Sequence, residues 1–366
     1  MKISRIARIS AVGAVAALAL AGCAANEAPA DNGNTDSPAS TLEGTLKATG
    51  ASSQGSAQEA WVAAFQTANT GVTINYEPTG SGTGRENFIA GASDFIGSDR
   101  AFKLDEFADG FEVCASDAIV EVPLYISPVA VAFNLEGVDE LNLDAKTIAG
   151  IFAGTITKWN DPAIADQNAG VALPDLAISP VHRSDPSGTQ ETFTKYLSAT
   201  AGDVWTYEAA DVWPINGGEA AQGTSGVVQA IKAGNGAIGF ADASQTADLG
   251  QVKVGVAGEY VAYSADAAAA LVENSPLEEG RGAGDLVFAV DPAAAPAGSY
   301  PIALVSYLIG CEEYKDAAVA PVVKAYFEYV ASEDGQNAAA DNAGSAPISA
   351  GLRDKVLAAI DTIKVG

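Results

Sequence analysis

One short segment of this chain combines a fixed positive charge with several small hydrogen-bond donors. Arg183 follows an expected strand over residues 177–181. An expected helix over residues 189–197 starts beside three small residues, Ser187, Gly188 and Thr189. At such a helix start the backbone N–H groups point outward and the helix dipole is positive, and a guanidinium adds a planar pair of donors. This segment is therefore expected to bind an anion.

Two earlier segments have the same order of strand, small-residue turn and helix. In the first, a strand over residues 45–49 leads through Ser52 and Ser53. In the second, a strand over residues 72–76 leads through Ser81. The helices expected after these two turns span residues 57–68 and 85–90. Ser and Gly cap many helices for structural reasons alone, so one turn is weak evidence. Three such turns at the carboxyl ends of strands can converge on one ligand crevice.

A carboxylate follows the next expected strand, at residues 95–96. Asp99 stands at the end of that strand, where an acid is usually a helix cap or a turn former. The glycines around Ser81 superficially suggest a nucleotide loop. They lack both the Gly-x-Gly-x-x-Gly spacing and the Gly-Lys-Ser/Thr ending, which argues against a nucleotide site.

The order of these segments resembles the phosphate-binding proteins of bacterial phosphate ABC importers. The resemblance spans roughly residues 46–363 and includes glycine and tryptophan motifs that could individually be packing features. In order, the motifs are Asn75-Tyr76, Gly80-Ser81, Asp94-Phe95, Ser98-Asp99, Trp159-Asn160-Asp161-Pro162, Arg183-x-Asp185-x-Ser187-Gly188-Thr189, Trp213-Pro214, Gly217-Gly218, Gly223, Gly226 and Gly236-Ala237-Ile238-Gly239-Phe240. The family fold is an α/β, two-lobed periplasmic-binding-protein fold of type II, with mixed sheets flanked by helices and the ligand in the interlobe cleft.

The resemblance implies a set of phosphate-binding residues and no catalytic residue. They are Ser52, Ser53, Ser81, Asp99, Arg183, Ser187, Gly188 and Thr189. An ionised carboxylate repels an anion unless the ligand has a proton to donate, as phosphate has at neutral pH and sulfate has not. A dry site that leaves this acceptor unpaired loses roughly 1–3 kcal/mol. We therefore expect Asp99 to select phosphate, while Arg183 and the helix starts attract the anion.

The beginning of the chain reads as a lipoprotein signal peptide, residues 1–23. Positive residues precede an apolar run too short to span a membrane, and small residues precede Cys23, as at a bacterial lipidation site. An uncleaved structural helix is the alternative. Residues 24–41 contain no large apolar side chain and are expected to form a disordered tether. The protein is thus expected on the extracytoplasmic face of the cell membrane, lipid-anchored.

The remaining 325 residues exceed the usual size of a single core, so two lobes are expected. The family architecture assigns residues 42–126 plus 284–366 to lobe one and residues 127–283 to lobe two. The first crossing is expected within residues 120–133, which Pro123 and Pro128 interrupt. The expected partners are the membrane permease and the ATPase subunits of a phosphate importer, with the protein itself a monomer.

The formal net charge of −27 argues against nucleic-acid binding. Removal of the signal peptide removes three positive charges and no acid, which changes the formal charge to −30. Such a surface cannot attract an anion from afar, so an anion site must work at short range. Cys114 and Cys311 could form a disulfide in an exported protein or remain buried thiols. With a single histidine, His182, no zinc cluster is expected, and no cofactor is implied.

Several alternatives remain open from the sequence. The nearest is a binding protein for sulfate or another tetrahedral oxyanion. An exported serine-type hydrolase with His182 as base is disfavoured, since the adjacent Arg183 would suppress protonation of the imidazole. A scaffolding lipoprotein with a vestigial site is a third. Among single residues, Arg183 could be a surface partner of Asp185, and Ser52 or Ser81 could be ordinary helix caps.

Overall fold

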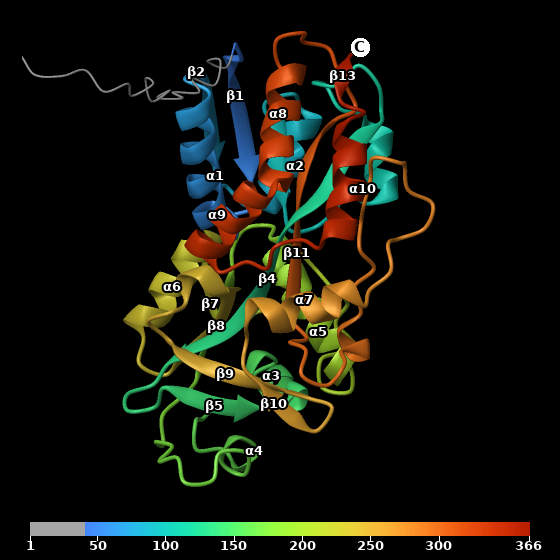
Figure 1. Cartoon of the computed structure of the whole chain (residues 1–366). Helices are drawn as coiled ribbons and strands as arrows, with labels where there is room; N and C mark the ends of the chain where they lie inside the picture. Colours follow the sequence, from blue (N-terminus) through green and yellow to red (C-terminus); the bar gives the residue numbers. More distant parts are fainter. Residues whose placement is uncertain (1–40) are drawn as a thin grey trace, which may run out of the picture. The chain divides into compact units, whose positions relative to one another are not determined.

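The computed structural model describes residues 41–366, in which strands and helices alternate along most of the chain (Figure 1). The expected signal peptide with Cys23, and nearly all of the expected tether, lie outside these residues. The described strands form one 11-stranded sheet and one small two-stranded sheet. No helix within residues 41–366 is both long enough and apolar enough to cross a membrane.

The first half of the large sheet has the order β2-β1-β3-β11-β4. The first three strands are parallel, and β11 joins them antiparallel. Their bounds are β1 Glu43–Gly50, β2 Gly71–Glu77, β3 Phe95–Ser98 and β11 Ala303–Cys311. The helices that follow β1 and β2 are α1 (Gly55–Ala68) and α2 (Ser81–Ile89). Helix α2 thus begins four residues earlier than expected, because Ser81 to Gly84 form its first turn.

The two sheet halves share one long strand, β4 (Ile119–Asn134). Its beginning pairs with β11 as far as Pro128, and from Val129 onward it pairs with β8 and then β9. The expected interruption by prolines is wrong, because each proline lies where the ladder tolerates it. Pro123 stands beside a register shift opposite Ser306 and Tyr307, and Pro128 stands where the pairing partner changes.

The second half of the sheet continues from β4 in the order β8-β6-β7, with β9 joining β4, β5 and β10. The strand bounds are β5 Glu140–Leu143, β6 Ser179–Arg183, β7 Glu219–Ala221, β8 Ala237–Asp242, β9 Gly250–Val256 and β10 Glu259–Val261. The helices along this part of the chain are α3 Ala145–Phe152, α4 Pro162–Ala165, α5 Gly188–Ala201, α6 Gly223–Ala233 and α7 Ala265–Glu273. Residues 41–366 also contain the short 3-10 helices η1 Leu104–Asp109, η2 Ala243–Gln245 and η3 Pro292–Ala294.

The chain end returns to the first half of the sheet. Figure 1 shows α8 and α9 beside α1, with α10 next to α8. Their bounds are α8 Ala320–Ala331, α9 Glu333–Ala343 and α10 Ala350–Ile360. The small sheet pairs β12 (Glu313–Tyr314) with β13 (Lys364–Val365). Trp61 of α1 is fully buried and donates its indole N–H to the Gly335 carbonyl at 2.7 Å, which fixes α9 against α1.

A disulfide joins Cys114 and Cys311, whose Cα atoms are 5.3 Å apart. It connects the loop before β4 to the end of β11, and both cysteines are buried in the main core. The bond closes a separation of 197 residues, so it links the two chain segments that build the first half of the sheet.

Candidate functional site

All eight residues of the expected site lie at the ends of strands or the beginnings of helices. Ser52 and Ser53 connect β1 to α1, Ser81 begins α2, and Asp99 directly follows β3. On the second half of the sheet, Arg183 ends β6, Ser187 caps α5, and Gly188 and Thr189 form the first turn of α5. All eight are buried. The structure therefore brings the four residues of the first half of the sheet and the four of the second half together, where these two halves meet.

Asp99 is the centre of this arrangement. Its Oδ1 accepts hydrogen bonds from Ser53 Oγ and Ser306 Oγ, both at 2.6 Å, and its Oδ2 accepts one from Thr189 Oγ1 at 2.7 Å. Its backbone N–H donates to Ser81 Oγ at 3.1 Å. Three hydroxyl donors fit an ionised carboxylate, which can accept about four hydrogen bonds. Ser306 on β11 was missed, because a serine inside an apolar strand gave no sign that it reaches a ligand turn.

The buried backbone N–H groups of Ser53, Gly188 and Thr189 have no acceptor in the described part of the chain, and the same is true of those of Ser52 and Ser81. The next N–H groups of α5 are satisfied, since Gln190 N–H donates to Ser187 Oγ at 3.3 Å and Glu191 N–H to the Ser187 carbonyl. A buried donor without an acceptor is costly. The beginning of α5 thus keeps two unpaired N–H groups at the positive end of its dipole.

Arg183 is fixed by its own neighbour along the chain. Its Nε donates to Asp185 Oδ1 at 2.8 Å, and its Nη2 donates to Asp185 Oδ2. Gly223 N–H also donates to Asp185 Oδ1, at 3.0 Å. Arg183 is only 3% exposed, so the pair is buried and is not the surface ion pair considered from the sequence. Within residues 41–366, Nη1 makes no hydrogen bond and remains a donor for a ligand.

A fourth turn of the same kind joins the site and was missed from the sequence. Thr224, in the first turn of α6, donates its backbone N–H to Ser52 Oγ at 3.1 Å, and the two hydroxyl oxygens lie 3.0 Å apart. The run Gly223-Thr224-Ser225-Gly226 after β7 has the composition of the other three turns. This composition could have identified the fourth turn from the sequence.

Two glycines allow the halves to approach closely. A Cβ on Gly188 would lie 2.5 Å from Asp99 Cβ, and a Cβ on Gly82 would lie 2.4 Å from Pro186 Cβ. Gly82 N–H donates to the Pro186 carbonyl at 3.1 Å, which is a direct backbone link across the boundary. The two halves of the sheet therefore contact each other directly at the site.

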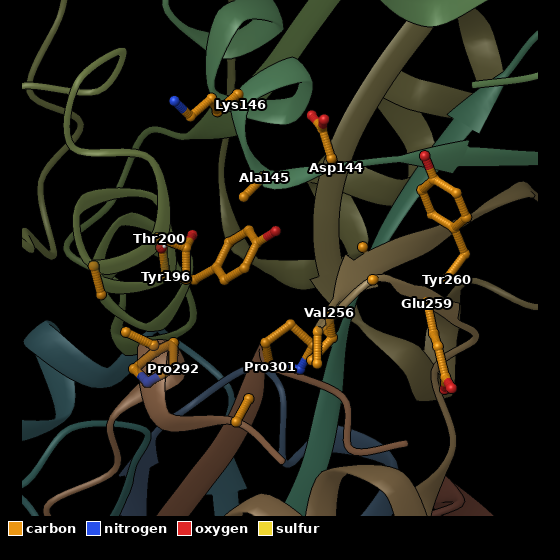
Figure 2. Close-up of a pocket in the computed structure, with 16 residues that line it drawn as sticks. Asp144, Ala145, Lys146, Tyr196, Thr200, Val256, Glu259, Tyr260, Pro292 and Pro301 are labelled. Carbon is orange, nitrogen blue, oxygen red and sulfur yellow. Dashed lines mark hydrogen bonds between the residues drawn. The ribbon is translucent and has the colours of Figure 1, made fainter. Parts of the chain in front are cut away.

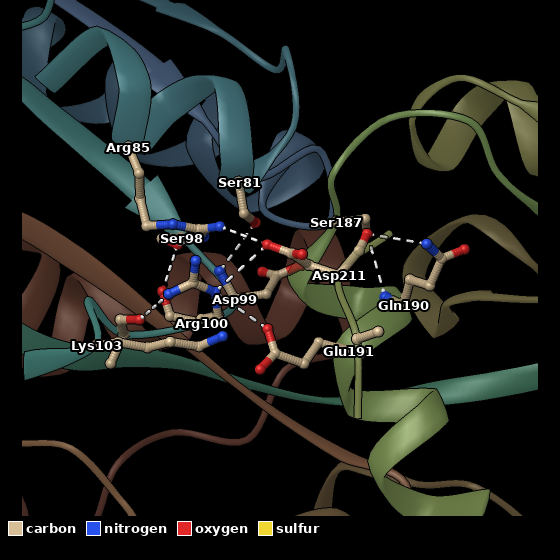
Figure 3. A network of polar contacts seen from close by, with 12 residues as sticks. Ser81, Arg85, Ser98, Asp99, Arg100, Lys103, Ser187, Gln190, Glu191 and Asp211 are labelled. Atoms are coloured by element: carbon tan, nitrogen blue, oxygen red, sulfur yellow. Dashed lines mark hydrogen bonds and ion pairs between the residues drawn. The ribbon is translucent and has the colours of Figure 1, made fainter. Parts of the chain in front are cut away.

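Beside Asp99, ion pairs also cross the boundary (Figure 3). Arg85 of α2 pairs with Asp211 at 2.9 Å, and Arg100 pairs with Glu191 of α5 at 3.1 Å and with Asp211 at 3.5 Å. Arg100 also holds Glu106. Burial alone would raise the pKa of the Glu106 carboxyl, but hydrogen bonds from Arg100 and from the Lys103 backbone outweigh it and lower the pKa to about 2. These charged residues, here named the boundary ion pairs, were not anticipated.

His182 is beside the site without taking part in it. Its ring stacks on Trp213 with centroids 4.8 Å apart, and its Nδ1 lies 2.9 Å from the Arg183 carbonyl oxygen. No serine hydroxyl among residues 41–366 hydrogen-bonds the imidazole, so the pair that a serine hydrolase requires is not formed there. The same residues contain no cluster of His, Cys, Asp and Glu that could hold a metal ion.

A larger hollow of about 620 Å³ lies elsewhere, between α3, α5 and the β9–β10 turn (Figure 2). None of the eight expected residues lines it. Two of its charged groups have structural tasks, since Asp144 caps α3 and Lys146 pairs with Asp203 at 2.6 Å. Volume alone therefore does not mark the functional site.

The fold and the boundary site together define a class of ligand-binding protein. A model of the PBP superfamily domain matches residues 35–334. The chain is 36% identical over 326 residues to Phosphate-binding protein PstS 3 of Mycobacterium leprae (strain TN), with 87% of each chain covered. It is 34% identical over 375 residues to PstS 3 of Mycobacterium tuberculosis (strain ATCC 25618 / H37Rv), covering 99% of this chain and 100% of that one. The chain therefore belongs to the PstS family within the PBP superfamily.

Solved structures show the same fold. A periplasmic phosphate-binding protein, PfluDING, bound with phosphate at pH 8.5, matches with a TM-score of 0.70 and 23% identity over 86% of this chain and 93% of that one. A putative phosphate ABC transporter substrate-binding protein from Clostridium perfringens, with bound phosphate, matches with a TM-score of 0.60 and 20% identity over 84% and 100%. The expected family and the two-lobed α/β fold are confirmed.

Proposed function

We propose that this protein binds inorganic phosphate outside the cytoplasm and delivers it to the permease and ATPase subunits of an ABC importer. The proposal rests on the PstS family and on one feature of the site. A buried carboxylate, Asp99, is surrounded by N–H and hydroxyl donors from both halves of the sheet. N–H and hydroxyl donors alone would bind any oxyanion. The carboxylate adds the requirement that the ligand carry a proton that it can donate.

The hydrogen bonds of Asp99 leave room for one more donor. Three of about four acceptor positions are occupied, two on Oδ1 and one on Oδ2. A protonated phosphate oxygen can donate to the remaining position on Oδ2. The N–H groups of Ser53, Gly188 and Thr189 and the Nη1 of Arg183 would then satisfy the other oxygens. A fully deprotonated oxyanion would meet the same donors, but it would be repelled by Asp99 and would leave the remaining position on Oδ2 without a donor.

The site residues themselves form part of the proposal. Ser53, Gly188 and Thr189 would act through backbone N–H groups, Arg183 through its guanidinium, and Asp99 through its carboxylate. Ser52, Ser81 and Ser187 would donate hydroxyl protons, because their oxygens already accept bonds from Thr224, Asp99 and Gln190 N–H groups. The sulfate alternative uses the same donors and differs only at Asp99.

Closure of two lobes around phosphate would make the protein a signal as well as a carrier. We assign residues 42–126 plus 284–366 to lobe one and residues 127–283 to lobe two, with β4 as one hinge because its pairing partner changes after Pro128. A ligand that touches both lobes favours the closed state by the affinity that it gains there. The permease would recognise the closed, ligand-bound state.

The location and the state of the protein complete the proposal. Lipidation of Cys23 would anchor a monomer to the extracytoplasmic membrane face, and the protein would bind without catalysing a reaction. Replacement of Cys23 by Ala should release the protein from membranes into the soluble fraction. Retention of the variant at the wild-type level would contradict the anchor.

Calorimetry on the full-length chain in detergent tests the ligand. Phosphate should bind tightly at neutral pH, while sulfate should give no resolved heat at the same concentrations. Equal affinities for the two anions would establish the alternative of a general oxyanion binder, and binding of neither would refute both.

A further inference from the structure

A series of hydrogen bonds between buried side chains leads from helix α8 to Asp99. Tyr326 of α8 donates its hydroxyl proton to Gln58 Oε1 at 2.7 Å, and Gln58 Nε2 donates to Gln54 Oε1 at 2.9 Å. Gln54 Nε2 donates to Ser306 Oγ at 2.7 Å, and the Ser306 hydroxyl donates to Asp99 Oδ1 at 2.6 Å. All five side chains are buried. Tyr326, Gln58, Gln54 and Ser306, here named the core polar network, thus end on the carboxylate of the site.

The direction of these hydrogen bonds is determined by the Tyr307 carbonyl, which can only accept. Gln54 Nε2 donates to this carbonyl at 3.1 Å, so the amide of Gln54 has one orientation. The same Nε2 also donates to Ser306, whose Oγ therefore accepts a hydrogen bond from the side of Gln54. The single hydroxyl proton of Ser306 is then available for Asp99. Gln54 thus fixes Ser306 as a donor to the carboxylate.

The two oxygens of Asp99 are held differently. Oδ1 accepts from both Ser53 and Ser306, whereas Oδ2 accepts from Thr189 and retains the position that a protonated phosphate oxygen would fill. Two donors on Oδ1 resist rotation of the carboxyl group about its Cβ–Cγ bond. Without Ser306 this rotation would be easier, and Oδ2 could turn away from the ligand turns. A fully deprotonated oxyanion would then meet less repulsion.

The surroundings of Gln54 are built to keep its amide in place. A buried amide is costly unless it is hydrogen-bonded, and a fully satisfied buried network favours one geometry. Gln54 and Gln58 lie one helical turn apart at the beginning of α1, and α8 lies beside α1 (Figure 1). Gly97 of β3 leaves the necessary space, because a Cβ there would lie 2.5 Å from Gln54 Oε1. Rigid elements of the core therefore hold the amide that orients Ser306.

We propose that Gln54 and Ser306 are positioning residues that determine how strictly the site rejects a fully deprotonated oxyanion. Ser306 acts through Asp99, and Gln54 acts through Ser306. This inference rests on the proposed phosphate function and extends the basis of selectivity from the ligand turns to α1 and β11. Phosphate and sulfate differ at the Asp99 carboxylate, so the two residues affect the ratio of the two affinities.

Affinities for phosphate and sulfate at about pH 8 test this proposal, with the full-length chain in detergent. Calorimetry gives the phosphate affinity, and displacement of bound phosphate gives the sulfate affinity. Both anions are mainly doubly charged at this pH, so a general change of charge or of folded fraction cancels in the ratio. Ser306→Ala should lower the ratio of phosphate to sulfate affinity by about ten-fold or more, as for a lost hydrogen bond to a charged group. Gln54→Met should lower it by about 2- to 10-fold, as for a neutral hydrogen bond.

Gln336→Met is the matched control. Gln336 is also a buried glutamine, but its Nε2 donates to the backbone carbonyls of Leu124 and Val330, and its Oε1 accepts the Ile348 N–H. This variant should lose stability in thermal unfolding, as Gln54→Met does, and keep the wild-type ratio of affinities.

A double variant tests whether Gln54 acts through Ser306. Gln54→Met combined with Ser306→Ala should have the same ratio as Ser306→Ala alone, because residues in one hydrogen-bond network are not additive. Additive losses, a wild-type ratio in Ser306→Ala, or equal losses in Gln336→Met and Gln54→Met would overturn the proposal. Ser306→Ala removes one hydroxyl and adds no atom, so it tests the proposal even if Gln54→Met does not fold. Absence of phosphate binding by wild type would instead refute the proposed function.

Discussion

The Thr189 hydroxyl donates to the Asp99 carboxylate at 2.7 Å, and this bond connects two chain segments 90 residues apart. Thr189 belongs to the first turn of α5, and Asp99 directly follows β3. The residue expected to select the ligand is thus also a contact between the two halves of the sheet. Under the proposed function, selection and closure would therefore depend on the same carboxylate.

Replacement of Asp99 by Asn should reduce discrimination between phosphate and sulfate more than it reduces phosphate affinity. The amide no longer repels a fully deprotonated oxyanion and can donate to one, so sulfate should gain affinity. We expect selectivity to fall by about 1–3 kcal/mol, the usual cost of an unpaired buried polar group. Calorimetry with both anions measures this change.

The matched control is Asp94→Asn, because Asp94 accepts the Lys47 backbone N–H at 2.7 Å and makes no contact with the site turns. It should leave the ratio of the two affinities unchanged. A larger loss of phosphate affinity than of sulfate exclusion in Asp99→Asn would show that Asp99 is not the proton acceptor.

Replacement of Gly188 by Ala should prevent full closure. The new Cβ would lie 2.5 Å from Asp99 Cβ and 2.7 Å from its carbonyl carbon, closer than any relaxed contact. Overpacking typically costs about 1–3 kcal/mol. We therefore expect phosphate affinity to fall at least about ten-fold. Small-angle scattering in saturating phosphate should show a more extended particle than wild type.

Gly351→Ala provides the comparison, since it also lies in the first turn of a helix and a Cβ there meets nothing within 4 Å. This variant should bind as wild type does and be slightly more stable, because Ala favours helix. Wild-type phosphate affinity in Gly188→Ala would contradict the close approach of Asp99 and α5.

The sequence identified those parts of the site that have a local signature. Helix starts after strands, such as Ser187 to Thr189, carry their own capping pattern, and the family resemblance added Asp99. Ser306 and the boundary ion pairs have no such pattern, because their roles come from contacts between segments far apart in the chain. Gln54, for example, donates to Ser306 Oγ at 2.7 Å across 252 residues. The continuity of β4 was also missed, since the tolerance for Pro123 depends on a register shift against β11.

The pair of Arg85 and Asp211 should stabilise the closed state. Arg85 is buried and also donates to Ser98 Oγ at 3.0 Å, so its guanidinium is held in place. Arg85→Ala and Asp211→Ala should each weaken phosphate binding, and the double variant should lose less than the sum. We expect a coupling energy of about 0.5–3 kcal/mol from the double-mutant cycle.

The pair of Arg353 and Glu333 is the control for this cycle. Its atoms lie 3.1 Å apart, but Glu333 is 79% exposed and the pair connects α9 with α10 away from the boundary. Removal of this pair should leave phosphate affinity unchanged. Additive losses for Arg85 and Asp211 would mean that their ion pair does not contribute to closure.

Loss of the disulfide should lower the free energy of unfolding without changing the site. The bond between Cys114 and Cys311 constrains 197 residues of chain, and the removal of such a cross-link typically costs about 2–5 kcal/mol. Guanidinium unfolding of the variant with both cysteines changed to Ala should show this loss, while phosphate affinity stays near wild type. Wild type in reductant should behave like the variant, and the variant itself should be insensitive to reductant.

Asp242 should make stability depend on pH. Burial raises the pKa of this carboxyl to about 6, although Oδ1 accepts bonds from Tyr125 Oη and the Ser244 N–H, both at 3.0 Å. Oδ2 has no partner in the described chain. Because the folded pKa lies above the unfolded value of about 4, folding favours the protonated form. The stabilising contribution is complete below about pH 4 and is lost as pH rises through 6.

Asp242→Asn isolates this effect, since the amide oxygen can still accept both hydrogen bonds while the group cannot ionise. Between pH 4 and 7, the wild-type free energy of unfolding should fall relative to that of the variant by about 2 kcal/mol, from about 1.36 kcal/mol for each unit of pKa. Denaturant unfolding at a series of pH values measures this difference. For Glu136→Gln, which changes an exposed carboxylate, the free energy of unfolding should depend on pH as it does in wild type. A constant difference between wild type and Asp242→Asn across this range would mean that Asp242 does not titrate there.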